Sequence, residues 1–234
     1  PKAAVLIPDV QRKRPILRPW MVGNDHTSVK DLVGSGLGLT GMIVRLKYVY
    51  PPEVVVERDV FGILLPFLQK HAKQATKLSC VGFCFGGWVV GRILGYQQVG
   101  ADHAGSSKNN NNSDSAKLKY QCGVGIHPSF QPNLLHFERT TTMAQRIQKP
   151  MLLLPAKNDV DMKPGTRVVE ILKQNRIGRG ESDPQVSIEF PNMWHGWVSR
   201  GDPTNPKMAQ EQERALQLTV DFIQKHTGSS APAG

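Results

Sequence analysis

Residues 82–87, with the sequence Gly-Phe-Cys-Phe-Gly-Gly, decide the fold that we expect for this chain. The apolar run 77–81 precedes them and predicts a buried strand, and residues 88–94 can continue as a helix. Small residues at a strand-to-helix junction let the two elements pack closely around a strained turning residue, here Cys84. The side chain of Cys84 would then lie at the carboxyl edge of a sheet above a helix N-terminus, which favours the thiolate.

The alternative role for Cys84 is that of a core residue, because free cysteines often pack as small hydrophobic side chains. We expect that inert role for Cys80 and Cys122. The glycines around Cys84 instead favour a nucleophile. Three cysteines do not make a disulfide framework and suggest a reducing compartment. We therefore expect a cytoplasmic protein, with a mitochondrial location as the alternative.

Two further strand ends carry the partners that an elbow nucleophile needs, a base that takes its proton and an acid that orients the base. Asp159 ends a polar loop after the apolar strand predicted at 151–154, and His195 follows the alternating strand predicted at 186–190. The order nucleophile, acid, histidine is the order found in this kind of fold. Because the carboxyl ends of parallel strands meet at one edge of a sheet, we expect the three groups to converge there.

The rest of the chain alternates between predicted helices and strands, which favours an α/β fold with a mostly parallel sheet flanked by helices. We expect a further strand at 120–126 and helices at 53–77, 166–174 and 207–226. The first of these helices should pack on the sheet. A single domain would cover residues 1–226, with a low-complexity insertion at about 105–117 and a disordered tail at 227–234.

Residues 11–52 do not predict a definite order of helices and strands. Residues 36–41 formally match a dinucleotide-binding fingerprint, but no apolar strand precedes them and no helix clearly follows. We therefore expect a flexible loop at 36–41 and no bound cofactor.

Four motifs follow one another along the chain: Gly-Phe-Cys-Phe-Gly-Gly at 82–87, Ala-Lys-Asn-Asp at 156–159, His-Gly-Trp at 195–197 and Arg-Gly-Asp-Pro at 200–203. In combination and in order, they resemble the dienelactone hydrolase family of α/β-hydrolases. The sequence His-Pro-Ser at 127–129 is similar to the plant and fungal branch of that family. The similarity runs from about Ala3 to about His226.

The resemblance implies that Cys84 is the nucleophile, Asp159 the acid and His195 the base of a hydrolase. Such an enzyme cleaves a small lactone or carboxylic ester through an acyl-cysteine, and it needs neither a cofactor nor a metal ion. The backbone N–H of Phe85, the residue after the nucleophile, would stabilise the oxyanion. Asp161 remains the alternative acid, because it lies only two positions beyond Asp159.

Four other residues could contact a substrate or support the site. His127 ends a predicted strand and could line the pocket or hydrogen-bond a loop. Trp194 and Trp197 flank the histidine base, with core packing as their ordinary role and stacking on a substrate as the alternative. Arg200 could pair with a substrate carboxylate or with the neighbouring Asp202.

The chain carries a formal net charge of +10. Its basic residues are spread over several segments and do not interleave with aromatic residues on one stripe, so a solvated surface is favoured over a nucleic-acid site. Such a surface would attract an anionic ester or lactone. No run of residues is apolar and long enough to predict a membrane span.

Residues 3–9 resemble the strand ending in Pro-Asp that members of the family reach only after several earlier strands. On this resemblance the sheet is N-terminally shortened and lacks the loop that supplies the second oxyanion N–H. Losing one such donor costs on the order of 3 kcal/mol in transition-state stabilisation. The alternative to an active hydrolase is therefore a catalytically impaired structural or partner-binding subunit, whose protein partner would cover the open sheet edge.

Overall fold

The structure is a computed structural model and describes residues 53–72, 75–103, 118–130 and 138–228. The expectations for residues 1–52, including the shortened sheet and the loop at 36–41, lie outside these ranges. The insertion at 105–117 and most of the tail at 227–234 lie outside them as well. These expectations stay predictions.

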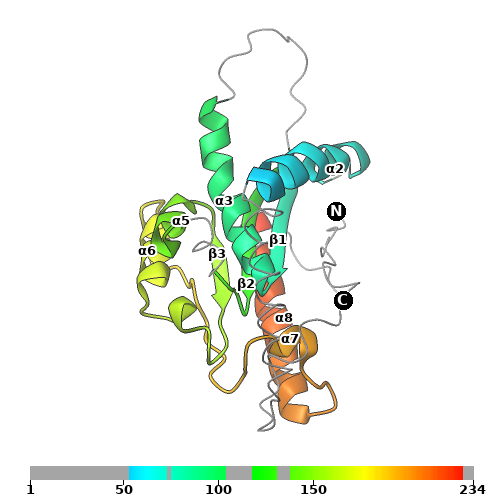
Figure 1. Cartoon of the computed structure of the whole chain (residues 1–234), viewed down its shortest axis with the longest axis vertical. Coiled ribbons are helices and arrows are strands. Elements are labelled where there is room, and N and C mark those ends of the chain that lie inside the picture. The colour runs from blue at the N-terminus through cyan, green and yellow to red at the C-terminus, as the bar shows by residue number, and fades with distance from the viewer. Residues whose placement is uncertain (1–52, 73–74, 104–117, 131–137, 229–234) are drawn as a thin grey trace, which may run out of the picture.

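Three strands form a parallel sheet in which their order follows the chain (Figure 1). They are β1 (Lys77–Phe83), β2 (Lys119–Ile126) and β3 (Met151–Leu154). The register places Val81 opposite Val124, which in turn lies opposite Leu152. The strands predicted from the apolar runs are therefore confirmed, and such runs are typical of parallel strands that are buried on both faces.

Residues 186–190 extend this sheet beyond β3. Leu153 donates a backbone hydrogen bond to the Val186 carbonyl at 2.8 Å and accepts one from the Ile188 N–H at 3.0 Å. The ladder is then interrupted, because Pro155 has no N–H to donate. It resumes where the Phe190 N–H donates to the Pro155 carbonyl at 2.9 Å. The strand predicted here is thus present as an extended segment with two isolated parallel bridges.

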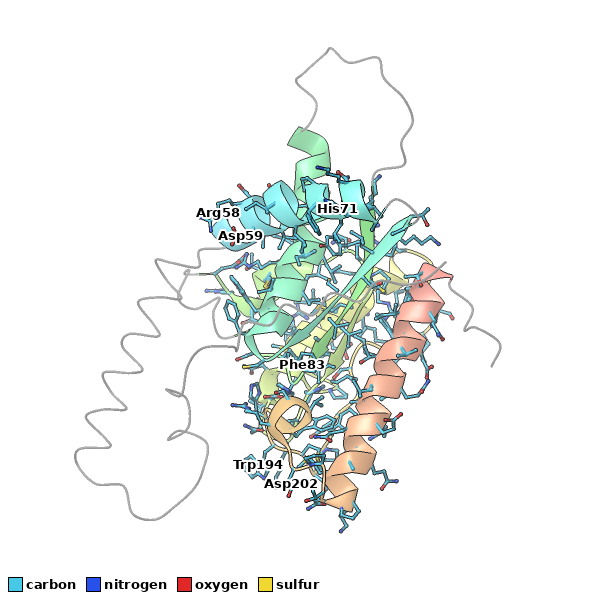
Figure 2. All side chains as sticks on the ribbon, turned by 90° about the vertical axis from the view of Figure 1, so that its right-hand side faces the viewer. Arg58, Asp59, His71, Phe83, Trp194 and Asp202 are labelled. Carbon is cyan, nitrogen blue, oxygen red and sulfur yellow. The ribbon has the colours of Figure 1, made fainter. Side chains whose placement is uncertain are left out.

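Helices cover both faces of the sheet, which lies between α3 and α8 in the view of Figure 2. One face carries α3 (Phe85–His103), which packs against α5 (Thr140–Arg146), and α5 in turn packs against α6 (Arg167–Ile177). The other face carries α8 (Pro206–Thr227). Met151 and Leu153 of β3 belong to the core on the first face, whereas Leu152 and Leu154 belong to the core on the second. This arrangement confirms the α/β class.

The closing helix α8 has clear signals at both ends. The Asn205 side chain accepts hydrogen bonds from the backbone N–H groups of the first helical turn, and Pro206 occupies the first turn. Gly228, at φ 67°, ends the helix in the left-handed conformation. Ala215, Thr219 and Phe222 are buried at helical spacing and bind α8 to the sheet.

The prediction of one regular helix over 53–77 is wrong, whereas its packing on the sheet is confirmed in part, because the Phe61 ring lies 6.2 Å from that of Tyr120 in β2. Glu53–Leu64 forms a π-helix, η1, and only Leu65–His71 forms an α-helix, α2. Because π-helical hydrogen bonds run from residue i to i+5, the 3.6-residue spacing does not describe this segment. Ile63 is accordingly 61% exposed. The segment packs mainly against α3, where the Phe61 and Tyr96 rings lie 4.9 Å apart.

Within the described ranges, β1 pairs with a neighbouring strand on one side only. The residues that were predicted to precede it lie outside these ranges, so the open sheet edge stays a prediction. None of the helices described has the combination of length and hydropathy that a bilayer span requires.

Candidate active site

Cys84 forms the sharp junction between β1 and α3, with a positive φ of 53°. Its N–H donates to the Ile126 carbonyl at 3.2 Å, and its own carbonyl accepts from the N–H groups of Gly87 and Ser129 at 2.9 and 3.0 Å. A Cβ on Gly82 would collide with the Gly86 carbonyl, so the strand and the helix approach each other closely only because Gly82 lacks one. The structure therefore shows the strained turn that the flanking glycines predict.

Asp159 and His195 lie on loops that follow β3 and the 186–190 segment. Nδ1 of His195 lies 2.6 Å from Oδ1 of Asp159, and Oδ2 of Asp159 accepts from the Ala156 N–H at 2.8 Å. Because an ionised carboxylate only accepts hydrogen bonds, Nδ1 carries the proton and Nε2 is left for the thiol. Asp161, the alternative acid, is exposed, and no contact between it and His195 is found among the described residues.

The electrostatics of the pair Cys84 and His195 favour charge separation. Burial alone raises the pKa of the Cys84 thiol, but the hydrogen bond and the charge of His195 outweigh it, so the pKa lies below its ordinary value. The Phe85 N–H and the charge of Arg200 act in the same direction. Burial lowers the pKa of His195, but hydrogen bonds with Asp159 and Cys84 raise it to about 9. Each shift favours the charged form of its group, that is, a thiolate on Cys84 and an imidazolium on His195.

The Phe85 N–H is a backbone donor beside the Cys84 sulfur. Phe85 is the first residue of α3, so its N–H belongs to the group that has no partner inside the helix. It hydrogen-bonds toward Cys84, which contributes to the low pKa of the thiol. The oxyanion role expected for this N–H stays a prediction.

Sequence reasoning passed over Asn158, which fixes the loop that carries the histidine. Its side-chain oxygen accepts a hydrogen bond from the His195 backbone N–H at 2.8 Å. The Lys157 N–H also donates to the Met193 carbonyl at 2.8 Å, so the acid loop and the base loop are joined twice. The available signal was the position of Asn158 directly before the acid.

The two tryptophans beside His195 have different environments. Trp197 is only 3% exposed and stacks against Phe190, with 4.6 Å between the rings, so it is a core residue. Trp194 is 64% exposed, and the Lys157 ammonium lies 5.3 Å from its ring. Figure 2 shows Trp194 at the same end of the molecule as Phe83, the last residue of β1. Of the two rings, only that of Trp194 is exposed, and the stacking role stays a prediction.

Arg200 ends α7 (Trp197–Arg200), a short helix that was not predicted from the sequence. Gly196 precedes α7 with a φ of 93°, and the Arg200 guanidinium packs so closely over it that a Cβ would not fit. This position brings the Arg200 charge close enough to lower the pKa values of Cys84 and His127. Asp202, the alternative partner of Arg200, accepts hydrogen bonds from the N–H and the hydroxyl of Thr204 at 2.9 and 2.7 Å.

His127 follows β2 and lies beneath His195 rather than at the surface. It is fully buried, with a φ of 38°, and its ring lies 4.8 Å from the His195 ring at an interplanar angle of 67°. Neither ring nitrogen has a hydrogen-bond partner within the described part of the chain. Because its side chain is fully buried, the structure does not place His127 on the wall of an open pocket.

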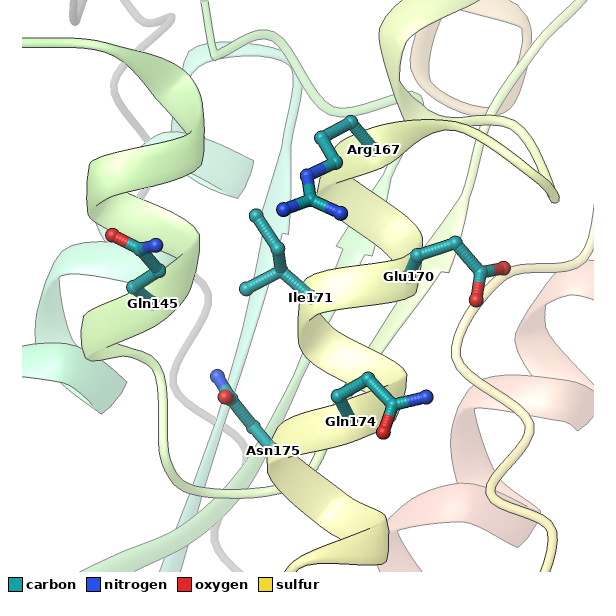
Figure 3. Close-up of a pocket in the computed structure, with 6 residues that line it drawn as sticks. All are labelled: Gln145, Arg167, Glu170, Ile171, Gln174 and Asn175. Atoms are coloured by element: carbon teal, nitrogen blue, oxygen red, sulfur yellow. The ribbon is translucent and has the colours of Figure 1, made fainter.

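A groove on another part of the surface runs between α5 and α6 (Figure 3). Its lining residues are Gln145, Arg167, Glu170, Ile171, Gln174 and Asn175. The Asn175 side chain donates to the carbonyls of Ala144 and Ile147 at 3.0 and 2.8 Å, which joins the two helices. None of these residues belongs to the cluster around Cys84. The groove is part of the packing contact between two helices.

Comparisons of this chain with protein-family models, with curated proteins and with solved structures find no match. The resemblance to dienelactone hydrolases accordingly depends on the motifs alone and stays a prediction. Within the described residues, no three His, Cys, Asp or Glu side chains are grouped in a way that could hold a metal ion.

Proposed function

We propose that this chain is a cysteine-dependent hydrolase of the α/β-hydrolase type, similar to dienelactone hydrolases, that cleaves a small lactone or carboxylic ester. The observation that supports it best is the connected row formed by Asp159, His195 and Cys84, with the cysteine on a strained turn. A buried structural thiol needs neither an imidazole partner nor a lowered pKa, and Cys80, where burial raises the pKa, illustrates the difference.

In the first half of the reaction, the Cys84 thiolate attacks the carbonyl carbon of the substrate. A C–S bond forms, and the carbonyl electrons move onto the oxygen, where the Phe85 N–H stabilises the negative charge. The tetrahedral intermediate then breaks its bond to the leaving oxygen as the His195 imidazolium gives that oxygen its proton. The products of this step are an alcohol and an acyl-cysteine, which remain one molecule in the case of a lactone.

In the second half, the neutral His195 takes a proton from a water molecule that attacks the thioester carbon. The new tetrahedral intermediate expels the Cys84 sulfur as a thiolate and releases a carboxylic acid. The imidazolium and the thiolate are thereby restored. Asp159 keeps the proton on Nδ1 throughout, so that Nε2 does the proton transfer in both halves.

The charge beside the nucleophile favours an anionic substrate. Arg200 lies close enough to Cys84 to lower the pKa of the thiol, and a guanidinium is suited to bind a carboxylate in a bidentate manner. The net charge of +10 acts in the same direction over longer distances. We therefore propose a lactone or ester that carries a carboxylate, with Arg200 as the residue that binds it.

The proposal is tested by the turnover of p-nitrophenyl acetate and of a dienelactone. The wild type should hydrolyse both, and mass spectrometry after a rapid acid quench should find the acetyl group on the peptide that contains Cys84. Cys84→Ala should show neither activity nor label, whereas Cys80→Ala, which removes a thiol outside the site, should keep both. Equal background rates for the wild type and Cys84→Ala would contradict the proposed hydrolase activity. The partner-binding subunit would then be the better proposal.

A further inference from the structure

His127 is a buried titratable group to which the proposed reaction assigns no step. Its side chain is fully buried, and in the described part of the chain both ring nitrogens lack a hydrogen-bond partner. Buried polar groups are ordinarily hydrogen-bonded, so this imidazole needs an explanation. Because the side chain is fully buried, the proposed reaction provides no substrate atom that could pair with it.

The contacts of the His127 ring are aromatic. Its centroid lies 4.8 Å from that of His195 in an edge-to-face arrangement, and 5.9 Å from that of Phe83. Aromatic rings at such distances prefer defined tilted geometries, so one ring restricts the rotation of the other. The His195 ring is thus held at one edge by Asp159 and packed against His127.

Among the described residues, three charged or titratable side chains act electrostatically on His127, and they come from different places in the fold. His195 lies on the loop before α7, Asp159 follows β3, and Arg200 ends α7. Burial, together with the charges of His195 and Arg200, lowers the pKa of His127 to about 3 against the opposing effect of Asp159. His127 is therefore neutral at every pH at which the site would work, and it does not compete with His195 for the proton.

The backbone explains why this ring belongs to a histidine. At a φ of 38°, His127 is in the left-handed region, which among residues other than glycine is adopted most readily by Asn, Asp and His. Of these three, only histidine has a ring. The turn is also tied to the nucleophile, because the Ser129 N–H donates to the Cys84 carbonyl at 3.0 Å.

We propose that His127 is a positioning residue, whose uncharged ring packs against His195 and holds the catalytic imidazole in the orientation that joins Asp159 to Cys84. This inference rests on the proposed function, because His127 acts only through His195. Packing of the ring, and not a hydrogen bond from its nitrogen atoms, orients His195. The unpaired nitrogens are then the consequence of placing a ring on a left-handed turn.

The test compares substitutions that separate the ring from the backbone. His127→Asn suits the left-handed turn and lacks the ring, and His127→Gly is a second ringless variant in case His127→Asn does not fold. His127→Phe keeps a ring at the expense of backbone strain. His71→Asn, at an exposed histidine at the other end of the molecule, is the matched control (Figure 2).

The measurement is the rate at which iodoacetamide alkylates Cys84 as a function of pH, followed on the peptide by mass spectrometry, with thermal melting as the check on folding. Wild type and His71→Asn should share a midpoint below that of an ordinary thiol. His127→Asn or His127→Gly should raise the midpoint by about one pH unit, because a freely rotating His195 stabilises the thiolate less. His127→Phe should restore the wild-type midpoint even if it melts at a lower temperature.

Two results would overturn the inference and leave the hydrolase intact. One is a ringless variant that keeps the wild-type midpoint, and the other is a His127→Phe variant whose midpoint rises as far as that of His127→Asn. An ordinary thiol midpoint in the wild type would instead overturn the proposed function, and the positioning role with it.

Discussion

Asp159 holds Nδ1 of His195 at 2.6 Å with one carboxylate oxygen, while the Ala156 N–H fixes the other oxygen at 2.8 Å. The carboxylate is buried and its orientation is set by the backbone of its own loop. This places the Nδ1 proton between the two side chains. The other nitrogen of the imidazole is consequently directed to the thiol, and the reactivity of the site depends on this bond.

Asp159→Asn should lower the rate of ester hydrolysis by on the order of a thousandfold or more, since an amide that donates to Nδ1 imposes the wrong tautomer. Asp161→Asn is the matched control, because Asp161 lies two positions away and is exposed. It should hydrolyse the same ester at the wild-type rate. Loss of activity in Asp161→Asn with retention in Asp159→Asn would transfer the role of the acid to Asp161.

The pH profile of kcat/KM for a dienelactone should be bell-shaped. The rising limb reports formation of the thiolate, and the falling limb reports loss of the His195 proton that the leaving group needs. Although burial opposes it, the hydrogen bonds of His195 raise its pKa to about 9, so the rate should fall as pH rises through that value. The two limbs belong to the coupled pair. A falling limb near 6.5, the ordinary value for histidine, would contradict the ion pair.

Because of His127, the free energy of unfolding should decrease as the pH is lowered from about 6.5. Burial lowers the pKa of His127 in the folded chain to about 3 from 6.5, so between these values the unfolded chain binds a proton that the folded chain excludes. Lowering the pH from about 6.5 to about 5 should then cost the wild type about 1 to 2 kcal/mol through this group. Urea unfolding of His127→Asn should show a smaller loss, while His71→Asn should follow the wild type. Parallel curves for all three proteins would refute the neutral buried imidazole.

Two of the three glycines of the elbow, Gly82 and Gly86, should differ sharply in their tolerance of alanine. A Cβ on Gly82 would overlap the backbone of Gly86, whereas a Cβ on Gly86 would meet no atom within 4 Å. Gly82→Ala should therefore destabilise the fold by about 2 kcal/mol or more. Gly86→Ala should be neutral or stabilising by up to about 1 kcal/mol, because it lies in the first turn of α3. Denaturant midpoints of the two variants test this, and equal losses would mean that the elbow is packed differently.

The strands and the convergence of the site residues could be predicted because each depends on local pattern and on one rule of topology. Short apolar runs bounded by polar loops located β1, β2 and β3, and parallel strands necessarily bring their carboxyl ends to one edge. Cys84, Asp159 and His195 each follow such an end, so their proximity followed without knowledge of side-chain contacts.

Other features depend on contacts that no local pattern records. The bonding of η1 changes the period on which the prediction of its buried face relied. The ladder beside β3 is interrupted by the missing N–H of Pro155, although residues 186–190 themselves have a regular alternation. The burial of His127 and Trp197 and the exposure of Trp194 depend on tertiary contacts, and the short helix α7 that begins at Trp197 was not predicted.

We propose that His195 stabilises the Cys84 thiolate, so that the two side chains form a thiolate–imidazolium pair. The most direct measurement is the ultraviolet absorbance of the thiolate across a pH titration, taken as the difference between the wild type and Cys84→Ala. We expect a thiolate that persists below pH 9.0, the ordinary midpoint of a cysteine thiol, and we expect His195→Asn to abolish this persistence. A difference titration with its midpoint at or above 9.0 would contradict the account.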